Sequence, residues 1–105
     1  MEVFQKGLEF YGSLITGPTH NYLSITFGVG PRTPIEYVET VKSRQGHSNE
    51  AIVSEIMDEH GSDFPINGNY HPHKVRFRSD DTPSKACYAR MIRVIIQHAG
   101  TNLQD

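Results

Sequence analysis

The chain has 105 residues, of which ten are Lys or Arg and twelve are Asp or Glu, so its formal net charge is −2. This length is near the common size of one domain, and a hydrophobic content of 36% is ordinary for a globular fold. No apolar run reaches the roughly 18 residues that a membrane-spanning helix needs, no secretory signal follows Met1, and the single Cys87 excludes an internal disulfide. We therefore expect one cytoplasmic domain over residues 1–105, without a membrane partner.

Three strands are predicted in the first part of the chain. Residues 8–15 are typical of a strand, and a turn cluster at residues 17–21 precedes a second, cleanly alternating strand over residues 22–27. These two strands should pair as a hairpin, and residues 35–41 predict a third strand. The alternation places Leu8, Phe10 and Leu14 on one face of the first strand, and in the second it places Leu23, Ile25 and Phe27 inward and Tyr22, Ser24 and Thr26 outward.

Two helices are predicted in the second half of the chain. The first begins at the Ser-Asn pair of residues 48–49, because either residue can cap a helix, and it ends at Gly61. The second helix has Thr82 as its N-cap and Pro83 in its first position, and Gly100 follows its end.

A fourth strand is predicted between the helices, over residues 73–79. Its alternation places Val75 and Phe77 on the face opposite Lys74, Arg76 and Arg78. The element order is thus strand-strand-strand-helix-strand-helix. The simplest architecture for this order is an α+β fold, a four-stranded mainly antiparallel sheet with both helices packed on one face.

The second helix carries apolar residues around nearly its whole circumference. Its polar stripe is narrow and consists of Arg90, Arg93 and Gln97. A helix that lies on a sheet needs only about a third of its surface to be apolar. Two interpretations are open: the helix is wedged between the sheet and the first helix, or part of it is a homodimer interface.

Three histidines, His60, His71 and His73, are candidate metal ligands. Pro72 favours extended backbone at His71, so His71 and His73 should both continue the inward face. His60 lies at the end of the first helix with Asp63 nearby, so the three imidazoles could converge and hold zinc or serve a small histidine-based enzyme. The spacing matches no metalloprotein signature, however, and a histidine at a helix C-terminus also compensates the helix dipole. We therefore expect no cofactor.

The strand at residues 73–79 predicts a row of outward basic side chains. A single-stranded nucleic acid would use such charges for its phosphates and flat rings for its bases. Two features oppose this interpretation: Arg90 and Arg93 should lie on the other side of the domain, and Glu9 and Glu36 could pair with the basic strand. The candidate contact residues are Lys74, Arg76, Arg78 and Tyr22.

The glycine-rich segment at residues 28–32 is a candidate anion site. Glycines free the backbone to approach an anion, and Arg32 could clamp it. No helix follows directly, so neither the phosphate loop nor the dinucleotide-binding fingerprint is present. The simpler interpretation is a connection between two strands.

Together these patterns favour a small binding or interaction module that forms a homodimer through the second helix or the open face of the sheet. Its partners would be a second copy of the chain, a small ligand or another protein. The alternatives are a histidine-based enzyme or metal-binding protein, and a single-stranded nucleic-acid-binding domain. Whether the three histidines share one pocket separates the first alternative from the others.

Overall fold

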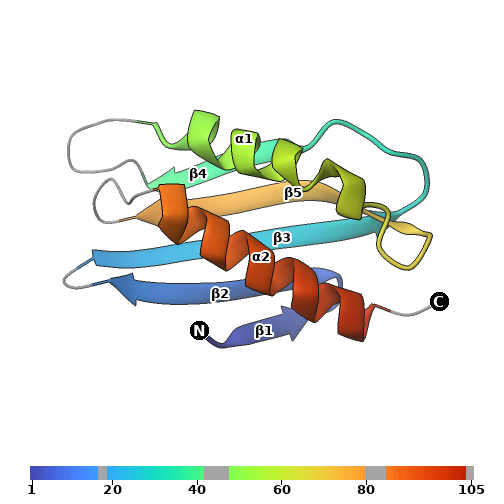
Figure 1. Ribbon diagram of the computed structural model, residues 1–105, viewed down its shortest axis with the longest axis horizontal. Coiled ribbons are helices and arrows are strands. Elements are labelled where there is room, and N and C mark those ends of the chain that lie inside the picture. The colour runs from blue at the N-terminus through green and yellow to red at the C-terminus, as the bar shows by residue number, and fades with distance from the viewer. Residues whose placement is uncertain (17–18, 42–47, 80–84, 104–105) are drawn as a thin grey trace.

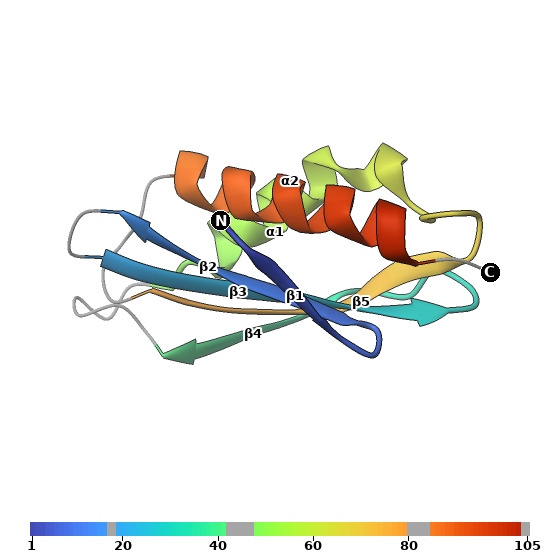
Figure 2. The ribbon, with the colours of Figure 1, turned by 90° about the horizontal axis from the view of Figure 1, so that it is seen from below.

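The computed structural model describes residues 1–16, 19–41, 48–79 and 85–103. Its elements follow in the order β1 (Val3–Lys6), β2 (Glu9–Thr16), β3 (Thr19–Val29), β4 (Glu36–Val41), α1 (Glu50–Glu59), the short 3-10 helix η1 (Gly61–Asp63), β5 (Tyr70–Ser79) and α2 (Lys85–Asn102). The strands form one sheet, and both helices lie on the same side of it (Figure 1, Figure 2). The expected α+β class is therefore confirmed.

The sheet is mixed and has five strands, where four mainly antiparallel strands were predicted. Its order is β1-β2-β3-β5-β4, and β4 runs parallel to β5 while the other neighbours are antiparallel. β1 is a short edge strand with largely exposed side chains, so it lacks the apolar signal of a core strand. The parallel pair arises because α1 connects β4 to β5, and a helical crossover carries the chain back to the end of the sheet from which it started.

The sheet has a covered face, which lies under the helices, and an open face on which no described element packs (Figure 2). The alternation predicted for residues 22–27 is confirmed in β3. On the covered face, Phe10, Leu23, Ile25, Phe27, Val75 and Phe77 each expose at most 2% of their surface. The helices bury Val53, Ile56 and Met57 of α1 and Tyr88, Met91, Ile92 and Ile95 of α2 in the same core.

A β-bulge in β5 changes the face to which His73 belongs. Phe27 of β3 lies opposite Pro72, whereas the residue before Phe27 lies opposite Lys74. His73 is therefore an extra residue, and Pro72 takes the buried position beside Phe27. The His73 ring lies on the open face, against Gly28. The expected inward orientation of His73 is wrong, because the bulge reverses the alternation, and a bulge is where a strand tolerates a proline.

The wide apolar surface of α2 is covered within the chain. The helix contacts α1 as well as β1, β2 and β3. Among the residues placed by the structure, the large apolar side chains left exposed are Phe4, Leu8, Ile15 and Val29, and none of them belongs to a helix. Among the described residues, no helix combines the length and the hydropathy needed to cross a membrane.

The C-terminal end of α2 lies beyond the predicted stop. The helix runs through Gly100, at a cost of about 1 kcal/mol relative to alanine. This cost is offset because Leu103 is only 3% exposed and its carbonyl accepts a hydrogen bond from the Asn67 side chain. The cap predicted at residues 82–83, like the turn at residues 17–18, lies outside the described residues.

A buried hydrogen-bond network joins both helices to the sheet. Ser79 Oγ of β5 donates to Asn21 Oδ1 of β3 (2.6 Å) and lies 3.1 Å from the Tyr88 hydroxyl of α2. Because the Ser79 proton goes to Asn21, the Tyr88 hydroxyl donates to Ser79. Asn49, which precedes α1, hydrogen-bonds to Tyr88 and donates through its backbone and its amide to the Glu39 carboxylate of β4 (3.2 and 3.3 Å). Asn49 thus links the layers instead of capping α1 with its side chain.

Candidate functional site

A row of aromatic side chains crosses three strands of the open face. Phe4 of β1 lies opposite Tyr11 of β2, with ring centroids 5.7 Å apart and planes at 27°. The Tyr11 ring lies 6.3 Å from that of Tyr22 in β3, at 39°. Phe4 is 51% exposed, and we call these three residues the aromatic row. Rings in this arrangement offer flat faces on which planar groups can stack.

A line of basic side chains on β5 continues the aromatic row. Lys74, Arg76 and Arg78 project from the open face, as the sequence predicted, and we call them the basic line. As alternate residues of a strand they are spaced by about 6.7 Å. Arg78 lies directly opposite Tyr22 in the register of β3 and β5. The aromatic row and the basic line therefore meet where β3 pairs with β5, near the C-terminal end of β5.

Ser24 indicates how closely the two groups are packed. It belongs to the open face, with Tyr11 opposite it in β2 and Arg76 opposite it in β5. Even so, Ser24 is 0% exposed, and its hydroxyl has no hydrogen-bond partner among the described residues. The long side chains around Ser24 must therefore lie across it. The open face is one continuous surface instead of two separate patches.

The open face is positively charged, although the chain as a whole carries a net charge of −2. Its strand residues include four cations, Lys6, Lys74, Arg76 and Arg78, and two carboxylates, Glu9 and Glu36. The ion pair between Lys74 and Glu36 measures 3.8 Å and is exposed, so it contributes little. Arg76 and Arg78 have no ion-pair partner in the part of the chain that the structure describes.

Two shallow hollows in the open face meet at Arg76. One has a volume of about 490 Å³ and is bordered by Tyr22, Arg76 and Arg78, among others. The second, also of about 490 Å³, is bordered by Lys6, His73 and Arg76. Arg76 thus stands between two depressions that could each receive part of an extended ligand.

The remaining described cations do not extend this surface. Arg90 and Arg93 are exposed on α2, on the opposite side of the sheet, as the sequence predicted. Lys85 of α2 forms ion pairs with Glu55 (3.2 Å) and Glu59 (2.9 Å) of α1. Among the described residues, the positive charge of the open face therefore comes from the strands.

The structure does not bring the three candidate histidines together. His60 Nδ1 lies within hydrogen-bond distance of Asp63 Oδ2 (2.8 Å), and His60 borders a cavity near α2 that also includes Arg93. His71 borders a different cavity, and His73 lies on the open face. Among the residues that the structure places, no group of three or more His, Cys, Asp or Glu side chains could hold a metal ion.

Sequence reasoning located Tyr22 and the basic line but missed Phe4. The signal for Phe4 was Gly7, which lies between the two apolar residues Val3 and Phe4 and the next strand and whose φ of 60° suits the tight turn between β1 and β2. A glycine at this position is compatible with a hairpin. That hairpin would have placed Phe4 beside the aromatic side chains of β2.

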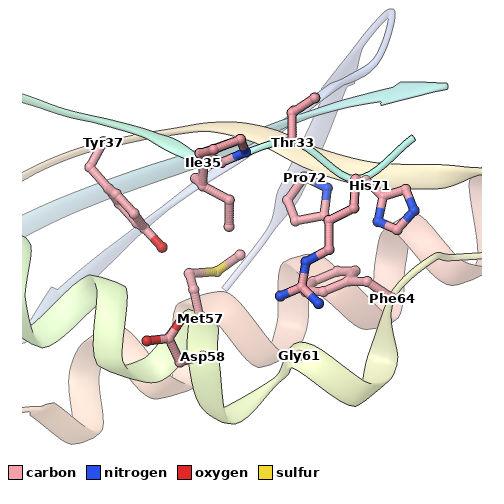
Figure 3. A pocket seen from close by; sticks show the side chains of 11 residues that line it. Thr33, Ile35, Tyr37, Met57, Asp58, Gly61, Phe64, His71 and Pro72 are labelled. Carbon is pink, nitrogen blue, oxygen red and sulfur yellow. The ribbon is translucent and has the colours of Figure 1, made fainter. Parts of the chain in front are cut away.

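A separate cavity of about 400 Å³ lies between β4, α1 and the start of β5, and we call it the β4–α1 cavity. Tyr37 and Asp58 lie toward one end of it, and His71 and Phe64 toward the other (Figure 3). The pKa of Tyr37 is raised to about 12, mainly by burial and further by the carboxylates of Asp58 and Glu50. Arg32, the anion clamp considered from the sequence, borders this cavity.

Comparisons with protein-family models, curated proteins and solved structures found no match to this chain.

Proposed function

We propose that the protein binds single-stranded nucleic acid on its open face, with bases stacked on the aromatic row and phosphates held by the basic line. One observation carries this proposal: a row of exposed and half-buried aromatic rings adjoins arginines that have no ion-pair partner among the described residues, and the two groups meet where Tyr22 lies opposite Arg78. Flat rings for bases and cations for phosphates are the two requirements of a single-strand platform.

The chemistry of a single strand suits both groups of side chains. Every base has a flat π-face, so stacking on the aromatic row requires no particular sequence and contributes about 1–3 kcal/mol per base. Among the described residues, Arg76 and Arg78 have no carboxylate partner to release before they bind phosphate oxygens. A duplex keeps its bases stacked inside the helix, so the aromatic row favours unpaired strands.

A second copy of the chain suits the open face less well. Two such faces packed together would bury two basic lines against the two carboxylates, Glu9 and Glu36, that the described strands place on each face, and burying unpaired charge is costly. The other surface expected to form a homodimer, on α2, exposes no large apolar side chain among its described residues. A nucleic acid supplies the negative charge that the open face lacks.

Fluorescence anisotropy with labelled oligothymidine and oligouridine tests the proposal. Both strands should bind at low salt, and a duplex of the same length should bind more weakly. If the basic line neutralises three phosphates, the logarithm of the affinity should fall against the logarithm of salt concentration with a slope of about −2. Absence of binding at low salt, or binding that does not weaken as salt rises, would overturn the proposal.

Two variants separate stacking from charge. Tyr11→Leu and Tyr22→Leu should each weaken binding by about tenfold to a hundredfold while leaving the salt slope unchanged, because no phosphate contact is lost. Light scattering on the same samples measures self-association. A wild-type dimer that Tyr22→Leu dissociates would assign the open face to a second copy of the chain and contradict nucleic-acid binding there.

A further inference from the structure

The β4–α1 cavity is a second candidate site, on the helix side of the sheet and away from the open face. Its apolar walls include Ile35, Met57 and Phe64 (Figure 3). Its volume of about 400 Å³ falls in the range of roughly 300–1,000 Å³ that is typical of small-molecule sites. These walls suit the ring or the aliphatic chain of a small ligand.

Two opposite charges border this cavity without pairing with each other. Arg32 lies in the segment between β3 and β4, and Asp58 lies on α1. No ion pair joins them, and neither forms an ion pair with another residue in the described part of the chain. Unpaired charges of both signs beside an apolar wall are complementary to a molecule that carries both charges and an apolar group.

Two further polar groups, on Tyr37 and His71, complete the lining. Burial raises the pKa of Tyr37 from 10.0 to about 12, so its hydroxyl remains a hydrogen-bond donor well above neutral pH. His71 Nδ1 is buried and has no hydrogen-bond partner within the described residues. A buried polar atom without a partner is costly, so a ligand that reaches it gains a hydrogen bond at little desolvation cost.

We propose that the β4–α1 cavity binds a small zwitterion with an apolar body, the chemistry of a free aromatic amino acid. Its carboxylate accepts hydrogen bonds from Arg32, its ammonium group donates to Asp58, and its ring packs against Met57 and Phe64. This inference does not rest on nucleic-acid binding, since the sheet separates the two sites.

Chemical-shift mapping by NMR with three matched probes tests this site. Phenylalanine carries both charges, 3-phenylpropionate lacks the ammonium group, and 2-phenylethylamine lacks the carboxylate. Phenylalanine should shift the signals of Ile35, Met57 and Phe64 saturably, and each truncated probe should bind about tenfold more weakly or worse. If none of the probes causes saturable shifts at these residues, the proposal is wrong.

Two charge-neutralising variants assign the partners of each probe group. Arg32→Gln should abolish the preference for phenylalanine over 2-phenylethylamine, and Asp58→Asn should abolish the preference over 3-phenylpropionate. Arg90→Gln, on the exposed side of α2, should leave all three affinities unchanged. Both cavity residues are exposed, so the variants should keep the wild-type spectrum. Unchanged preferences in folded Arg32→Gln and Asp58→Asn would contradict a zwitterion site.

Discussion

The covered and open faces of the sheet are formed by alternate residues of the same strands, yet their side chains differ in burial and in the pairing of polar and charged groups. On the covered face, apolar side chains such as Leu23 and Phe77 are completely buried, and the polar network around Tyr88 is hydrogen-bonded. On the open face, Phe4 remains half exposed and Arg76 has no ion-pair partner among the described residues. On the covered face, the described side chains bury and hydrogen-bond one another, whereas on the open face several aromatic and charged side chains remain in contact with solvent.

This difference separates what folding requires from what it does not. Helices that pack on a sheet require apolar residues beneath them, so the composition of the covered face follows from the fold. A solvated face needs only small polar or charged residues. The helices do not require aromatic rings on three neighbouring strands of the open face, beside arginines that have no ion-pair partner among the described residues, and this excess supports the proposed binding role. The following predictions test this contrast, beginning with the largest effect.

Substitution of Phe77 should distinguish the two faces most strongly. The Phe77 ring is fully buried and packs edge-on against Tyr88, with centroids 6.2 Å apart. Phe77→Ala should lower the free energy of unfolding by about 3–5 kcal/mol in urea denaturation. Tyr22→Leu on the open face is the matched control and should change it by no more than about 0.5 kcal/mol. Comparable losses of unfolding free energy in the two variants would show that the open face stabilises the fold as much as the covered face does, and would contradict the contrast.

Tyr88→Phe probes the polar part of the covered face. The variant keeps the ring but removes the hydroxyl that hydrogen-bonds to Ser79 and Asn49. The loss should lower the free energy of unfolding by about 1–3 kcal/mol, because buried partners are left unsatisfied. The measurement is again urea denaturation, and a neutral result would show that the network does not hold α2 on the sheet.

Gly28→Ala probes the bulge on the open face. A Cβ atom at Gly28 would lie 2.2 Å from the nearest atom of the His73 ring, so the ring must move. We expect displaced His73 signals in NMR spectra and a loss of about 1 kcal/mol, at the low end for overpacking, because a ring can rotate aside. Gly61→Ala, where a Cβ atom meets open space, is the control. A His73 ring that stays in place would contradict the described bulge.

A further expected effect, confined to alkaline pH, is a loss of stability through Tyr37. Its pKa is raised from 10.0 to about 12 in the folded protein, mainly by burial, so the fold favours the neutral phenol. This contribution is complete below about pH 10 and is lost as the pH rises toward 12. Denaturation curves at increasing pH should show the wild type losing stability relative to Tyr37→Phe in that window. If the stabilities of the wild type and Tyr37→Phe change with pH in the same way, the ionisation of Tyr37 is not coupled to folding.

The regular parts of the fold could be predicted because alternation needs no knowledge of the neighbouring strand. It correctly placed Tyr22 and the basic line on the open face. It failed at His73, where a single extra residue reverses the faces and only the adjacent Pro72 hinted at a bulge. The stop at Gly100 failed for a different reason: contacts with distant residues outweighed the local helix propensity.

The candidate site depends on pairings that one strand cannot reveal. The aromatic row requires the register that places Phe4 opposite Tyr11, and this pairing follows from the turn at Gly7. The predicted metal site required three histidines to converge. His73 instead lies on the open face, whereas His60 borders a cavity near α2. The spacing of the histidines in the sequence does not indicate how far apart their side chains lie in the fold.

Nucleic-acid binding by paired arginine variants tests the central claim most directly. Arg76→Gln with Arg78→Gln removes two charges from the open face, and Arg90→Gln with Arg93→Gln removes the same charge from α2. Anisotropy with labelled oligothymidine should show the first pair losing most of its affinity, with a salt slope reduced by about 1.4, or 0.7 for each phosphate contact. The second pair should bind as the wild type does. Equal losses in the two pairs would mean that net charge alone drives binding and would contradict a site on the open face.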